Sequence, residues 1–135
     1  MKLSTRAKYG LRIVFLLGVE TEKKVSLTTL VKQTDLSEKY LEQILGMLRR
    51  GGIVDSARGA SGGYSLSRAP EEITIKQTLS ALDDAFEIAD CINGKCPDEY
   101  CPNKLIFRRL YDRIDGILAN TTIADMIKDY RCIKK

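Results

Sequence analysis

The chain has 135 residues, of which 44% are hydrophobic and 30% charged, an ordinary balance for a globular protein with one core and an association element. The net charge of +4 is uneven: residues 1–68 hold 12 Lys and Arg against 6 Asp and Glu, whereas residues 69–135 hold 10 against 12. Basic residues interrupt the only apolar run near the start, and no run approaches the roughly 18 residues of a membrane span. We therefore expect a cytoplasmic protein whose thiols stay reduced, without a secretory signal or membrane contact.

The first predicted helix runs from Ser4 or Thr5 to about Glu20 and is apolar on almost every side. Such a helix must be covered on several sides, so we expect it at the centre of the core. A second, short helix is predicted from Ser26 to Gln33. The tight connection Thr34-Asp35-Leu36 leads from it into the next helix.

The helix after that connection has two different faces. Ser37 is a good N-cap, because its hydroxyl can accept a hydrogen bond from an amide of the first turn. One apolar stripe recurs at three- and four-residue spacing, at Leu41, Ile44, Leu45 and Leu48. Gly51-Gly52 ends the helix, since glycine readily adopts the left-handed conformation. Two helices joined by a tight turn, the second polar on its exposed face, predict a helix-turn-helix.

Two short strand-like runs follow, Ile53 to Ala57 and Tyr64 to Arg68, on either side of a glycine-rich tip. The pattern predicts a mainly α fold with a small β-hairpin wing, that is, a winged helix-turn-helix DNA-binding domain over residues 1–70. An amphipathic helix beside an ordinary surface hairpin is the alternative. The short capped helix in front and the excess of positive charge favour the DNA-binding interpretation.

The predicted DNA contacts lie on both helices and on the wing. Gln43 can pair bidentately with adenine, and Glu42 can accept from cytosine. Arg58 at the wing suits the negative potential of the minor groove. Phosphate contacts, which fix register without reading sequence, are expected from Thr28, Arg49 and Arg50. The whole predicted set is Thr28, Ser37, Lys39, Tyr40, Glu42, Gln43, Arg49, Arg50, Arg58 and Ser61.

Residues 71–102 are predicted to form a linker helix, from Gln77 to about Ala89, and a cysteine-rich loop. The loop has no helical period, and its cysteines are Cys91, Cys96 and Cys101. Their four-residue gaps differ from zinc-ribbon pairs and from ferredoxin spacings, yet three thiolates on one irregular loop can converge on one metal centre. The alternatives are an iron–sulfur cluster, a zinc ion and a metal-free thiol switch. The fourth cysteine, Cys132, is remote in sequence, and the chain has no histidine.

Residues 103–135 are predicted to hold a long helix ending near Asn120 and a last helix that is opened by a capping box of Thr122 and Asp125 and runs through Tyr130. Alternating three- and four-residue steps give the long helix a coiled-coil-like seam at Phe107, Leu110, Ile114 and Ile117. We expect this seam to form a homodimer interface, because two DNA half-sites require a two-fold protein. An ordinary helix packed within its own chain is the alternative.

The motifs MKLSTRAKYGLR, KYLEQIL and LRRGGIVDSARGASGGYSLSR, with the three-cysteine loop before a long helix, resemble the IscR family of winged-helix transcription regulators. The resemblance covers nearly the whole chain. It implies a homodimeric repressor on near-palindromic DNA, with a 2Fe–2S cluster on Cys91, Cys96 and Cys101 and control of iron–sulfur biogenesis genes. It also implies that Glu42 helps to separate two classes of operator.

The chain departs from the family pattern at the fourth cluster ligand. Its cysteine gaps are one residue shorter, Lys104 stands at the family's histidine position, and Lys8 replaces the aspartate of the nitric-oxide-sensing branch. Two alternatives therefore stay open: a cluster-free, thiol- or zinc-responsive regulator of cysteine or redox metabolism, and a small iron–sulfur carrier. An enzyme is not expected, because the sequence shows neither a nucleophile–base pair nor a phosphate loop.

Overall fold

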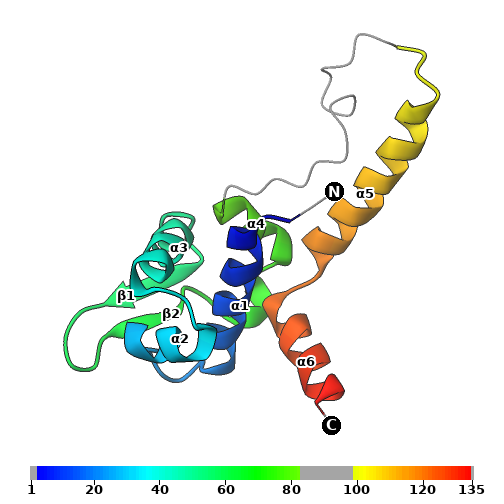
Figure 1. The fold of residues 1–135 in the computed structure, drawn as a ribbon. Coiled ribbons are helices and arrows are strands. Elements are labelled where there is room, and N and C mark those ends of the chain that lie inside the picture. The colour runs from blue at the N-terminus through cyan, green and yellow to red at the C-terminus, as the bar shows by residue number, and fades with distance from the viewer. Residues whose placement is uncertain (1–2, 83–98, 135) are drawn as a thin grey trace.

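The computed structural model describes residues 3–82 and 99–134. Figure 1 shows a helical head (residues 3–82) with a small hairpin. A long helix projects away from the head, and the last helix follows the lower end of this long helix. The elements in chain order are α1 (Thr5–Val19), α2 (Leu27–Thr34), α3 (Glu38–Arg50), β1 (Val54–Ala57), β2 (Gly63–Leu66), the 3-10 turn η1 (Pro70–Glu72), α4 (Ile75–Ala81), α5 (Asn103–Asn120) and α6 (Ile123–Ile133). The predicted mainly α fold with a β-hairpin wing is confirmed.

Helix α1 occupies the centre of the head, as predicted. The Ser4 hydroxyl caps it by accepting a hydrogen bond from the Ala7 amide at 3.0 Å. Ile13, Val14 and Leu17 are buried in the core. The helix contacts α2, α3, α4, α6 and β2, so its apolar residues are covered from several directions.

The helix-turn-helix consists of α2, a short turn and α3. Ser26 and Ser37 cap the two helices, each by accepting a hydrogen bond from the backbone three residues on. Asp35 adopts a left-handed conformation with φ 58°, and its amide donates to the Val31 carbonyl at 2.9 Å. A single left-handed residue therefore reverses the chain between the two helices.

The wing is an antiparallel pair in which Val54 faces Leu66 and Ala57 faces Gly63. Strand β1 begins one residue later than predicted, because the Ile53 amide still bonds to the end of α3, at the Leu48 carbonyl. Strand β2 begins one residue earlier than the predicted Tyr64 and ends at Leu66 instead of Arg68. Gly63 has φ 144°, and a Cβ there would lie 2.6 Å from the Val25 carbonyl oxygen. Only glycine permits this close approach, which lets a β-bridge between Val25 and Tyr64 join the start of β2 to the segment before α2.

The C-terminal half differs from the sequence expectation in three places. Pro70–Glu72 forms a 3-10 turn that was not predicted, and α4 begins at Ile75 instead of Gln77 because Thr74 caps it and Gln77 completes a capping box. The predicted continuation to about Ala89 lies outside the described residues. Helix α5 has the predicted extent, and α6 starts with the predicted Thr122–Asp125 capping box but continues past Tyr130 to Ile133.

Helix α6 returns to the head. Its Ile123 and Ile127 are buried in the same core as α1. An isolated β-bridge between Thr74 and Thr122 also joins the start of α4 to the junction between α5 and α6. None of the helices in the described ranges is long and apolar enough to cross a membrane.

Candidate nucleic-acid interface

The two faces of α3 have opposite character. The apolar stripe of Leu41, Ile44, Leu45 and Leu48 is at most 1% exposed. The opposite face carries exposed polar side chains, at Lys39, Glu42, Gln43, Arg49 and Arg50. Burial of the apolar stripe fixes the rotation of the helix, so the polar face is held towards solvent, where a DNA groove could receive it.

A shallow hollow of about 430 Å³ borders this polar face. Glu42, Gln43 and Arg50 of α3 line it together with Arg6 of α1. The Arg6 guanidinium is not free, because its Nε donates to the Leu82 carbonyl at 2.9 Å. Arg6 therefore holds the end of α4, while the three α3 side chains remain exposed.

Tyr40 differs from its neighbours on α3. Its ring is half-buried and meets the Tyr9 ring edge-on, with centroids 6.2 Å apart. The other nine predicted contact residues are exposed. Packing against α1 therefore limits how far the Tyr40 side chain extends towards a bound duplex.

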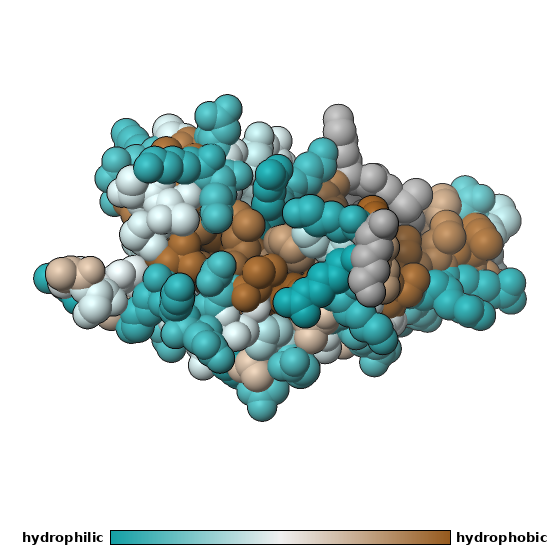
Figure 2. Space-filling view, turned by 90° about the horizontal axis from the view of Figure 1, so that it is seen from below, coloured by the Kyte–Doolittle hydropathy of each residue, from teal (hydrophilic) through white to brown (hydrophobic). Residues whose placement is uncertain are grey.

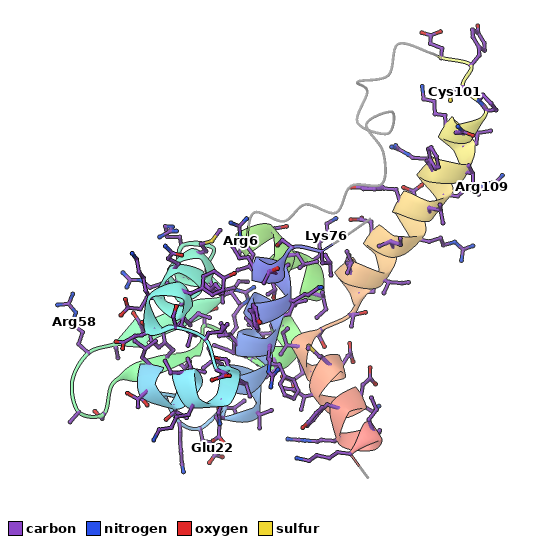
Figure 3. All side chains as sticks on the ribbon, in the orientation of Figure 1. Arg6, Glu22, Arg58, Lys76, Cys101 and Arg109 are labelled. Carbon is purple, nitrogen blue, oxygen red and sulfur yellow. The ribbon has the colours of Figure 1, made fainter. Side chains whose placement is uncertain are left out.

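The wing lies beside α3 and carries its cation at the outer edge of the molecule. Figure 3 shows Arg58 pointing away from the head at the tip of the hairpin, where Ser61 is also exposed. Arg49 in the last turn of α3 donates to the Ser56 hydroxyl of β1 at 3.3 Å. This hydrogen bond joins α3 to the wing and helps to fix the position of these two predicted DNA-binding elements relative to each other.

Arg68 was not among the predicted DNA contacts, and the structure gives it a structural role. Its guanidinium donates to the Gly52 carbonyl at 3.0 Å and to the Gln77 side-chain oxygen at 3.3 Å. A basic residue at the end of the wing motif would ordinarily be counted as a phosphate contact. Its partners are distant in sequence, so no local pattern could have identified this structural role.

Of the three predicted cluster ligands, the structure places only Cys101, because Cys91 and Cys96 lie outside the described residues. Cys101 is half-exposed and lies just before α5, at the tip of this helix that is farthest from the head (Figure 3). Cys132 is exposed and lies in α6, which follows the opposite end of α5. An 18-residue helix is about 27 Å long, so Cys132 does not lie beside Cys101 in one chain. Over residues 3–82 and 99–134, no three His, Cys, Asp or Glu side chains gather as a metal site.

Helix α5 carries the predicted seam on a largely uncovered surface. Phe107 and Ile114 are half-buried, whereas Leu110 is 38% and Ile117 64% exposed. In the part of the chain that the structure describes, α5 has no fully buried residue. Figure 2 shows apolar surface along this projecting arm as well as across the middle of the head. A seam left open in this way is available to a second chain.

Comparison with known proteins decides the family. Residues 3–129 match the Rrf2 family, described as iron-dependent transcriptional regulators. The chain belongs to the Rrf2 family. The match spans the head, α5 and most of α6, so it covers the candidate interface and the seam alike.

Two kinds of Rrf2 regulator are similar to this chain. The HTH-type transcriptional regulator CymR of Bacillus subtilis is 34% identical over 127 residues, which are 93% of this chain and 89% of CymR. IscR of Escherichia coli is 29% identical over 132 residues, 96% of this chain and 82% of IscR.

Solved structures of both kinds share the fold. The structure of CymR, the global cysteine regulator of B. subtilis, has a TM-score of 0.80 at 32% identity and covers 95% of this chain and 97% of CymR. That of T. potens IscR has a TM-score of 0.78 at 33% identity, covering 96% of this chain and 88% of IscR. This Rrf2 protein is thus a winged-helix, DNA-binding transcriptional regulator and not an enzyme, and the predicted resemblance to the IscR family is confirmed.

Proposed function

We propose that this Rrf2 protein is a homodimeric repressor of near-palindromic operators, and that an iron–sulfur cluster on Cys91, Cys96 and Cys101 sets its DNA affinity or sequence choice. One observation carries the proposal. The three cysteines are evenly spaced along the sequence just before α5, and Cys101 lies at the end of that helix.

The reading of DNA is proposed for the exposed face of α3 and for the wing. Gln43 and Glu42 have the donor and acceptor groups that distinguish base pairs in the major groove. Lys39, Tyr40 and Ser37 stand in the same first turns of the helix. Thr28, Arg49 and Arg50 would neutralise phosphates, while Arg58 and Ser61 would enter the minor groove.

Replacing Arg58 tests this surface. Because Arg58 is exposed at the wing tip, R58A should leave the fold intact and weaken specific operator binding by about 1–3 kcal/mol, measured by titration at fixed salt. Arg109, exposed on α5, supplies the matched control, and R109A should bind the operator like the parent. Operator affinity that is unchanged in R58A would remove the wing from the reading surface.

Dimerisation is proposed through the seam of Phe107, Leu110, Ile114 and Ile117. Its uncovered apolar surface supports this, as does the need for two heads on two half-sites. We retain the division into a reading domain (1–70), a linker with the cluster loop (71–102) and a dimerisation part (103–135). In that arrangement α6 would anchor the dimerisation part to the head, because it packs on α1 and η1.

The donor set fits an iron–sulfur cluster in its chemistry, since three thiolates are the ligands such clusters use. A bound 2Fe–2S cluster would supply a group that responds to iron supply and to oxidation. In this chain, Cys101 would connect that group directly to α5. The remoteness of Cys132 from Cys101 argues against Cys132 of the same chain as the fourth ligand.

The test is anaerobic purification followed by an absorption spectrum, iron and sulfide counts, and operator binding. We expect coloured protein whose DNA affinity changes when the cluster is removed. C96A should lose colour and iron but remain a folded dimer, whereas C132A should keep both. Iron retained by C96A would contradict the proposed ligand set.

The second candidate is a cluster-free regulator of cysteine or redox metabolism that responds through zinc or thiols. The similarity to CymR and the presence of Lys104 at the family's histidine position favour it. In that case the purified protein would contain no sulfide, and its operator affinity would respond to zinc or to thiol oxidants. An iron–sulfur carrier is less favoured, because the relatives are regulators, and a salt-dependent shift of operator DNA would exclude it.

A further inference from the structure

Helix α4 has only seven residues, yet it lies between the elements that matter for reading DNA as a dimer. It packs against α1 and α3 in the head and against α5 in the projecting arm. Figure 1 shows it on the side of the head that is nearest the lower end of α5. Its contacts with α3 and with α5 fix the positions of these two helices relative to each other.

On the α3 side, the end of α4 packs closely against the end of the recognition helix α3. A Cβ added to Gly51, the C-cap of α3, would overlap the Cβ of Ala81 and lie 3.1 Å from its Cα. Gly51 has φ −78° and ψ 0°, a conformation that any residue adopts. The requirement for glycine at this position therefore comes from the proximity of α4 and not from the backbone conformation.

A hydrogen-bonded bridge reinforces this contact. Arg68 donates both to the Gly52 carbonyl, just after α3, and to the Gln77 side-chain oxygen in the first turn of α4. The same Gln77 oxygen accepts from the Thr74 amide at 2.9 Å as part of the α4 capping box. The start of α4 and the end of α3 are thus bonded through one guanidinium.

On the other side, α4 is joined to α5. Lys76 and Asp115 form an ion pair of 2.8 Å, and the hydrogen bond that the Lys76 ammonium donates to the Asp115 carboxylate raises the pKa of Lys76. The Ile75 amide also donates to the Thr121 carbonyl at 2.9 Å, immediately after α5. An exposed ion pair contributes little stability by itself, but together with a backbone bond it defines the position of the helix.

We propose that α4 is the spacer of the dimer, and that Gly51, Ala81, Arg68 and Gln77 are positioning residues that determine which half-site separation the protein accepts. The inference rests on the proposed function as a dimer that reads two half-sites. Each base pair moves a half-site by about 3.4 Å along the duplex, so selection of one separation requires the two recognition helices to be held firmly relative to the dimer axis.

The experiment uses the full-length protein and duplexes that differ only in spacing. A near-palindromic site selected with the parent protein is rebuilt with one base pair added to or removed from its centre, and a single half-site serves as a fourth probe. The parent should prefer its selected spacing. In G51A the new methyl group pushes α4 away, so that preference should fall about tenfold, as for one misplaced base contact, while half-site affinity is kept.

Two matched variants make the readout specific. The double variant G51A/A81G removes the overlapping methyl group and should restore the spacing preference, which a general loss of stability would not do. G116A introduces the same glycine-to-alanine change on α5, where a Cβ meets nothing within 4 Å, and should behave like the parent.

The outcomes distinguish a failure of the proposed dimeric DNA binding from a failure of the spacer role of α4. A parent protein that is monomeric, or that binds all spacings equally, overturns the proposed dimeric reading and this inference with it. A parent with a clear preference that G51A retains overturns the spacer alone, as does a G51A that loses half-site binding in the same proportion. If G51A does not fold, K76E and D115K replace it: each should relax the preference, and the double reversal should restore it.

Discussion

Helices α3 and α5 carry the same kind of apolar repeat, but the two repeats differ in how far the rest of the chain buries them. The stripe of α3 is at most 1% exposed, because α1, α2 and α4 cover it. On α5, Leu110 is 38% and Ile117 64% exposed, and among the described residues only α4 makes substantial contact with this helix. An apolar repeat therefore predicts that a helix face is covered, but it does not say whether the same chain or another chain covers it.

The two helices also begin differently. Ser37 caps α3 by accepting from the Tyr40 amide at 3.1 Å. Within the described residues Pro102, at the corresponding position of α5, provides no side-chain cap. Helix α3 is therefore stabilised both by its cap and by its burial, whereas the described structure shows neither a side-chain cap nor a fully buried residue on α5.

The largest expected effect is a core truncation in α3. L45A removes buried methyl groups from the stripe and should lower the free energy of unfolding by about 2–5 kcal/mol, measured by urea denaturation. Q43A, on the exposed face of the same helix, should change stability by no more than about 0.5 kcal/mol. Equal losses in the two variants would contradict the burial of the stripe.

The corresponding change on α5 should act on association. L110D places a charge within the proposed seam, so the dimer dissociation constant should rise by about 30-fold or more, measured by sedimentation equilibrium. The head should stay folded, because Leu110 is not part of its core. L105D is the control, since Leu105 is 73% exposed and outside the seam, and a dimer weakened equally by both variants would argue against the seam.

A smaller effect is expected at the helix ends. S37A removes the cap of α3 and should reduce stability by about 1 kcal/mol, followed by thermal and urea unfolding. N103A changes an exposed polar residue in the first turn of α5, where the described structure shows no side-chain cap, and should remain within about 0.5 kcal/mol of the parent. A neutral S37A would show that packing alone fixes the start of α3.

The smallest effect concerns pH and the cap of α6. The Thr122 amide donates to Asp125 at 2.9 Å and lowers the pKa of that carboxyl below its ordinary 3.8. Because the folded-state pKa is the lower one, this stabilisation is present above about pH 4 and is lost as the pH falls through the folded value. D125N should therefore flatten the acid end of the stability–pH curve, and an unchanged curve would contradict the cap.

Most helix boundaries could be predicted because their signals are local. Ser4, Ser26, Ser37 and Thr122 each precede a helix, and in the structure each accepts a hydrogen bond from its first turn. For the first helix the sequence left Ser4 and Thr5 as alternatives, and the structure has Ser4 as the cap. The wing was predicted from two strand-like runs around a glycine-rich tip, and each predicted strand differs from the observed one by one or two residues at an end. Its ends depend on the Val25 bridge and on the end of α3, which no local pattern reveals.

Long-range contacts could not be predicted. Arg68 joins Gly52 and Gln77, and Ile123 completes the core of a head that ends some forty residues earlier in the sequence. Such contacts depend on the path of the chain in space and leave no periodicity behind. The candidate DNA-contacting residues were predictable as a class, because type and periodicity identify an exposed polar face, but their individual partners on DNA remain predictions.

The bridge between Thr74 and Thr122 has a mechanical consequence for the rest of the molecule. It pins α5 at its base, while Cys101 stands at the opposite tip. A rod about 27 Å long that tilts by about 10° carries its tip through about 5 Å. A small rotation of α5 at its base is thus amplified into a displacement of the Cys101 thiol. This displacement exceeds the length of any single bond that the thiol could form.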